Sequence, residues 1–145
     1  MNMHYRFAYA AIASASLFAT PFGIAKSTEV SKAAEAHFVN LKDGSTVRSP
    51  FKVVFGSTNI AIARAGTVMA NSGHYHLLID TRITPAQLVG PLPNDPQHLH
   101  FGKGQTEAIV ALPPGTHTLQ IVMGDGRHWL HARPVKSKPI SLHVQ

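Results

Sequence analysis

The chain of 145 residues contains no cysteine. This absence excludes disulfides, thiolate nucleophiles, zinc ribbons and iron–sulfur clusters together. A single domain of this size buries roughly two thirds of the surface that its unfolded chain exposes, so it folds without covalent crosslinks. Stability must therefore come from the packing of a core.

Charged residues are also scarce, and acidic ones most of all. Only 14% of the residues are charged, with 13 Lys and Arg against 7 Asp and Glu, and the formal net charge is +6. The basic residues are spread along the chain, whereas a nucleic-acid-binding protein shows a denser stripe with stacking aromatics. We therefore expect no nucleic-acid partner.

The common catalytic signatures are missing as well. The sequence has no G-x-S-x-G nucleophile motif, no phosphate-binding loop and no dinucleotide fingerprint. A hydrolytic metal centre adds a carboxylate base beside an open metal position, and Glu107 is the only plausible one. The sequence leaves an enzyme open but favours a non-enzymatic protein.

One apolar run stands at the N-terminus, and none of comparable length follows. Residues 1–25 combine a basic residue (Arg6), an apolar stretch over 7–18 and small residues at 23–25, which is the layout of a secretory signal. The stretch is shorter than the roughly 20 residues that span a bilayer as a helix. We predict a signal peptide over 1–25, with an uncleaved anchor as the alternative. The mature protein is then periplasmic or secreted, without a membrane span.

The rest of the chain is typical of a β protein. After a polar segment at 26–35, predicted to be a flexible lead-in, one domain is expected over 36–145. No window keeps a helical period with caps. Four prolines predict a stiff loop over 81–97. Strands are predicted at 37–41, 51–55, 73–80, 98–101, 106–112, 116–123 and 140–144. Seven short strands indicate an all-β, immunoglobulin-like β-sandwich, with a small jelly roll or open barrel as the alternative.

Histidine is the residue that the chain has in excess. Two pairs have the form H-x-H, and residues i and i+2 of a strand share one face. Two imidazoles placed in this way can close on one metal ion. Seven of the ten histidines fall in the second half of the chain: His74, His76, His98, His100, His117, His128 and His131. We predict the two pairs as metal ligands, completed by one or more of the other three.

Imidazoles without thiolates favour Cu(II), Zn(II) or Ni(II). Beyond the predicted signal peptide only Met69 and Met123 remain, so a methionine-rich Cu(I) carrier is not expected. We predict an exported protein that binds Cu(II) or Zn(II) as a carrier, buffer or sensor. Structural histidines bonded to backbone carbonyls, a pH sensor, a module that binds an envelope protein or glycan, and a metal-dependent hydrolase using Glu107 remain alternatives.

Six motifs follow one another along the chain: FVNLKDG at 38–44, SPFKV at 49–53, GHYHLLID at 73–80, HLHFG at 98–102, GQTE at 104–107 and LPPGTHTLQ at 112–120. Together they resemble a family of small secreted bacterial proteins catalogued as a domain of unknown function. The resemblance covers roughly residues 37–144 and implies an exported single domain with an immunoglobulin-like fold, without assigning an activity. The family pattern includes both H-x-H pairs, Gln105-Thr106-Glu107, His117 and the loop histidines. This chain departs from the family's G-D-H-N-H-x-P-H, because Gly126 replaces the first histidine and Leu130 the proline.

Overall fold

The structure is a computed structural model that describes residues 29–145, so the predicted signal peptide lies outside the described residues. Within this range the chain forms nine strands and one short 3-10 helix, η1 (Pro85–Leu88). The prediction of an all-β sandwich is confirmed. No helix in the described range is long and apolar enough to cross a membrane.

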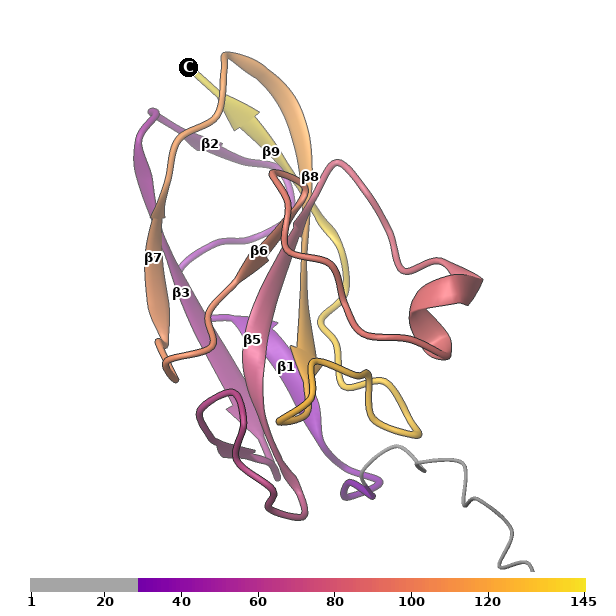
Figure 1. The fold of residues 1–145 in the computed structure, drawn as a ribbon. Coiled ribbons are helices and arrows are strands. Elements are labelled where there is room, and N and C mark those ends of the chain that lie inside the picture. The colour runs from indigo at the N-terminus through magenta and orange to yellow at the C-terminus, as the bar shows by residue number, and fades with distance from the viewer. Residues whose placement is uncertain (1–28) are drawn as a thin grey trace, which may run out of the picture.

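Two sheets face each other across the core (Figure 1). The smaller sheet has the order β1-β3-β7, and the larger one has the order β2-β9-β8-β5-β4, with β6 also paired to β5. Each of the seven predicted strands has a counterpart. The other two, β2 and β4, have three and two residues, too few for alternation to mark them. The strands are β1 (Glu35–Phe38), β2 (Ser45–Val47), β3 (Phe51–Thr58), β4 (Ala61–Ile62), β5 (Ser72–Ile79), β6 (His98–His100), β7 (Glu107–Val110), β8 (Gly115–Gly124) and β9 (Ile140–Val144).

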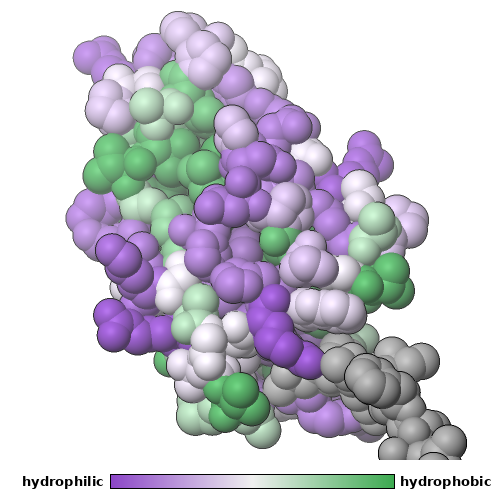
Figure 2. All heavy atoms as spheres, in the orientation of Figure 1, coloured by the Kyte–Doolittle hydropathy of each residue, from purple (hydrophilic) through white to green (hydrophobic). Residues whose placement is uncertain are grey.

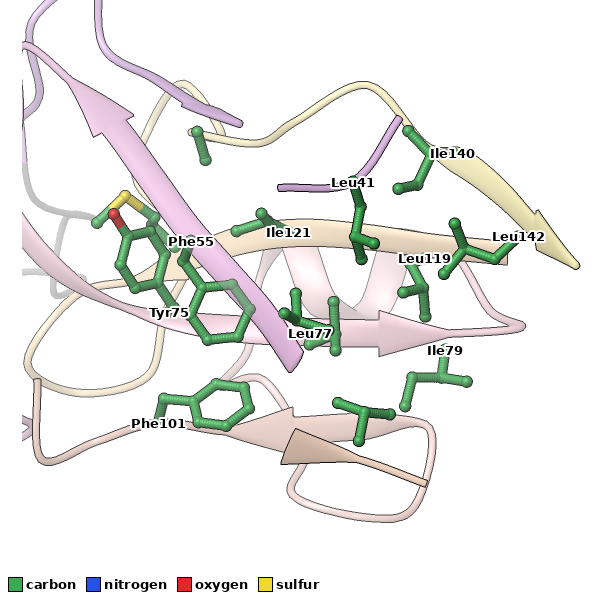
Figure 3. Packing of buried hydrophobic residues seen from close by; sticks show 14 of the residues in the cluster. Leu41, Phe55, Tyr75, Leu77, Ile79, Phe101, Leu119, Ile121, Ile140 and Leu142 are labelled. Atoms are coloured by element: carbon green, nitrogen blue, oxygen red, sulfur yellow. The ribbon is translucent and has the colours of Figure 1, made fainter. Parts of the chain in front are cut away.

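The main core fills the space between the sheets (Figure 3). In β3, Phe51, Val53 and Phe55 are buried and the residues between them are more exposed, as expected for a strand with one face on the core. The Phe55 ring packs 5.1 Å from the Tyr75 ring and 4.8 Å from the Phe101 ring, between centroids. Tyr75 and Phe101 both belong to this core.

Strand β5 differs because all eight of its residues are buried. One face belongs to the main core, and the other lies under loops. Leu78 on that outer face packs with Leu92, Val122 and Leu130 in a second, smaller apolar cluster. Figure 1 shows the 81–97 loop and the 125–138 segment on the side of the larger sheet that faces away from β3 and β7. A third layer, made of loops, therefore covers part of the larger sheet.

The visible surface in Figure 2 is mostly polar, with apolar patches over the upper part of the smaller sheet, at a loop tip and around η1. The exposed large apolar residues of the described chain include Val68, Leu88, Val89 and Ile109. These are scattered positions on a small protein, and scattered apolar side chains are normal on protein surfaces.

Candidate metal centre

Strands β5 and β6 carry three imidazoles to one place on the outer face of the larger sheet. His74 and His76 alternate with the core residues Tyr75 and Leu77, so both side chains leave β5 on the loop side. His76 lies directly opposite His100 in the antiparallel register of β5 and β6. The three residues offer one ligand atom each, and these atoms all lie within 4.8 Å of one another.

A fourth imidazole joins them from the loop after β8. The His128 ring centroid lies 4.7 Å from that of His100 and 5.1 Å from that of His74. It lies farther, 6.2 Å, from the His76 ring. We call His74, His76, His100 and His128 the histidine cluster. Three of its members stand on strands and one stands on a loop.

The closest pair has a spacing that suits a shared metal ion. The Nε2 atoms of His74 and His76 are 3.1 Å apart. Two nitrogens bound to one metal at about 2.0–2.1 Å lie about 2.9 Å apart at a right angle and about 3.3 Å apart at the tetrahedral angle. The observed separation falls between these values, so a single ion can reach both nitrogens with little movement of the rings.

The cluster is buried and short of hydrogen-bond partners. His74 is 0% exposed and His76 is 1% exposed. Among the described residues, no hydrogen-bond partner meets Nδ1 of His74, Nδ1 of His76 or Nε2 of His100. Buried polar atoms are nearly always satisfied in folded proteins, and an exception points to strain or to a bound ion or water. Nε2 of His100 is therefore open to an ion, whereas in His74 and His76 the two Nε2 atoms face each other and Nδ1 lacks a partner.

Electrostatics keep these rings neutral. Burial, followed by the neighbouring imidazoles, lowers the pKa of His74 to about 4, although Asp125 works in the opposite direction. The same causes lower the pKa of His76 to about 2, and burial followed by His128 lowers the pKa of His100. Only a neutral imidazole has a lone pair for a metal ion, so at neutral pH these three rings are ready to bind one.

Two glycines make room for the rings. A Cβ atom on Gly124 would lie 2.9 Å from Nε2 of His76, and a Cβ on Gly102 would lie 2.4 Å from Nε2 of His100. The sequence analysis did not connect these glycines with the site. Gly102 belongs to the HLHFG motif, but Gly124 is brought to the cluster only by the register that pairs it with His74.

Loop contacts hold His128 in place. The Asp125 carboxylate oxygen Oδ1 accepts hydrogen bonds from the backbone N–H groups of Arg127 and Trp129. The backbone N–H of His128 donates to the Asp125 carbonyl at 2.8 Å, and its own carbonyl accepts from Leu92 N–H at 2.7 Å. His128 has a φ of 67°, which few residues other than glycine adopt. Its position is therefore set by the tertiary contacts of two loops.

The structure does not bring the other three predicted ligands into the cluster. His98 is the first residue of β6, at the opposite end of the strand from His100. Its Nδ1 lies 2.9 Å from the Asp95 carboxylate, and its Nε2 lies 2.9 Å from the Gln87 side-chain nitrogen. Nδ1 of His117 meets Asp80 at 2.6 Å and its Nε2 donates to the Pro113 carbonyl, so this ring ties strands together.

His131 lies behind the cluster. Its Nε2 donates to the Ser72 carbonyl at 2.9 Å, and the ring packs against Gly73. An i, i+2 spacing places side chains on one face, but it does not show which of them find closer partners. The interpretation of histidines as structural groups bonded to carbonyls therefore describes His117 and His131 better than metal ligation does.

The carboxylate considered as a hydrolytic base is also elsewhere. Glu107 belongs to β7 in the smaller sheet, where it forms an exposed ion pair with Lys52 at 3.0 Å. The histidine cluster stands on the outer face of the larger sheet. Glu107 is therefore not placed to act as a base at the cluster.

Fold and site together define a β-sandwich with a buried histidine cluster on the outer face of its larger sheet. The chain belongs to the family described as a domain of unknown function, DUF4399, whose model matches residues 53–145. The matched range contains all four cluster histidines. No significant match was found among curated proteins or among solved structures.

Proposed function

We propose that this protein binds one Cu(II) or Zn(II) ion in the histidine cluster and acts as a metal carrier, buffer or sensor. His74, His76 and His100 are the core ligands in this proposal, and His128 is the fourth. The observation that carries it is the convergence of three neutral imidazoles, two buried and one half-buried, whose ligand atoms lie within 4.8 Å of one another. Imidazole donors without thiolates favour these borderline metals.

The proposal includes a place in the cell. The N-terminal sequence has the layout of a secretory signal, so we infer a periplasmic or secreted protein. The partner is then a metal ion outside the cytoplasm, and another envelope protein donates or accepts this ion.

Equilibrium dialysis with elemental analysis tests the proposal. The purified protein without residues 1–25, offered micromolar Cu(II) or Zn(II), should retain about one metal ion per chain. His100→Gln should weaken the affinity at least about 10-fold, because it removes one of three core ligands. His100 is the least buried of these three, so its variant is the one best suited to keep the fold.

A matched control is His143→Gln, which makes the same change at an exposed histidine of β9 outside the cluster. It should leave metal affinity unchanged. Retention of less than about 0.2 metal ion per chain by the unaltered protein would rule out the metal-binding function. That result would favour the alternative, an interaction module that binds an envelope protein or glycan.

A further inference from the structure

His98 has both ring nitrogens engaged by groups of defined hydrogen-bonding character. The Gln87 side-chain oxygen accepts from the Thr84 backbone N–H at 2.8 Å, so the Gln87 amide NH2 faces His98. An amide NH2 only donates, and a carboxylate only accepts. Nε2 of His98 therefore accepts from Gln87, and Nδ1 donates to the Asp95 carboxylate. The two bonds thus fix the orientation of the ring.

These two bonds connect the 81–97 loop, which we call the Pro-rich loop, to the His98 side chain at two points. Gln87 lies in η1 and Asp95 lies near the end of the loop, and His98 is 8% exposed beneath them. Between these points the loop runs past the segment that carries His128. Pro91 forms a backbone bridge with Trp129, and Leu92 N–H donates to the His128 carbonyl at 2.7 Å.

Apolar packing makes the connection stiff. Leu92 is buried with Leu78 and Val122 of the larger sheet and with Leu130 of the 125–138 segment. A shift of the Pro-rich loop therefore moves the peptide group of His128, because close-packed interiors transmit displacement. The three strand-borne imidazoles are also held by sheet pairing, which His128 lacks.

We propose that His98 and Gln87 are positioning residues that seat His128 against the other three imidazoles, and so set how tightly the cluster holds its metal ion. The inference rests on the proposed function for its effect on affinity. It gives a role to a histidine that the sequence groups with the ligands, and this role needs no contact with metal.

The test is a double-mutant cycle. Gln87→Leu removes the donor to His98, and Gln97→Leu makes the same change at an exposed glutamine of the same loop. Gln87→Leu should weaken Zn(II) affinity about 10-fold in the unaltered protein and less than about 2-fold when combined with His128→Ala. Gln97→Leu should have no effect. Equal losses with and without His128, or no loss at all, would overturn the proposal.

A metal-free measurement separates the two proposals. Trp129 is the single tryptophan and forms a backbone bridge with Pro91 of the clamped loop. Acrylamide quenching of its fluorescence should increase in Gln87→Leu and stay unchanged in Gln97→Leu. If the unaltered protein binds no metal, the proposed function fails, whereas this contrast in quenching still supports the seating of His128. Identical quenching in all three proteins overturns it.

Discussion

At the scale of the residue, the cluster depends on small neighbours as much as on imidazoles. His76 is fully buried, and its Nε2 lies where only a glycine at position 124 leaves space. Gly124 does not have a positive φ, so its backbone tolerates a side chain and its role is steric. A ligand site can therefore be damaged at a residue that binds nothing.

Gly124→Ala should lower Zn(II) affinity at least about 10-fold, because the added methyl group displaces the His76 ring. The free energy of unfolding should fall by only about 1–3 kcal/mol, as is usual for overpacking. Dialysis and urea denaturation measure the two quantities. Gly56→Ala, also without a positive φ, places its methyl group against the exposed His37 ring outside the cluster and is the control that should keep its affinity. Unchanged metal binding in Gly124→Ala would contradict the steric role.

At the scale of the element, two hydrogen bonds connect the C-terminal end of β5 to the N-terminal part of β8. Asp80, just after β5, accepts from the Thr118 backbone N–H at 2.8 Å and from Nδ1 of His117. The hydrogen bond to Asp80 raises the pKa of His117. Burial opposes ionisation of Asp80, but the hydrogen bonds from His117 and Thr118 outweigh it and lower the pKa of that carboxyl. This charged pair fastens the end of the sheet away from the cluster.

His117→Ala should therefore destabilise the protein by about 1 kcal/mol at pH 6. The pKa of His117 is raised in the folded state, so its contribution is complete below about 6.5 and is lost as the pH rises through the folded pKa. The difference between variant and unaltered protein should shrink at pH 9. Urea denaturation at both pH values measures it, with His143→Ala as the control. A loss of the same size at both pH values would contradict a charged tie.

At the scale of the whole molecule, the loop layer is what distinguishes this sandwich. The Pro-rich loop and the segment after β8 bury the outer face of β5, and with it the imidazoles. Burial keeps His74 and His76 neutral, which prepares a metal site but makes the metal-free fold sensitive to acid. Between about pH 6.5 and the lowered pKa values, these two histidines are protonated in the unfolded chain but not in the folded chain.

The metal-free protein should accordingly lose about 4 kcal/mol of stability between pH 7.5 and pH 5, about 2 kcal/mol for each of the two rings. The pKa values of His74 and His76 are lowered on folding, so their contribution is complete above about 6.5 and is lost as the pH falls below that value. Urea denaturation across this range measures the loss. Zn(II) at about 100 times its Kd should add about 2.7 kcal/mol at pH 7.5. A stability that is flat between these pH values would contradict neutral burial of the two rings.

The sequence by itself determined the fold class and the same-face pair of histidines on β5. Alternation and turn residues mark the longer strands, and an i, i+2 spacing on a strand places His74 and His76 on one face whatever the rest of the chain does. These are local properties, written within a few residues of one another.

Only the tertiary structure decided which other histidines join the pair. Strand register places His100 opposite His76, and loop packing places the His128 ring beside that of His100. His98, His117 and His131 instead form hydrogen bonds with other groups outside the cluster. Gly124 becomes part of the site through pairing with a residue fifty positions away. The physical reason is that register, loop closure and hydrogen-bond competition depend on contacts between distant segments, which no local spacing encodes.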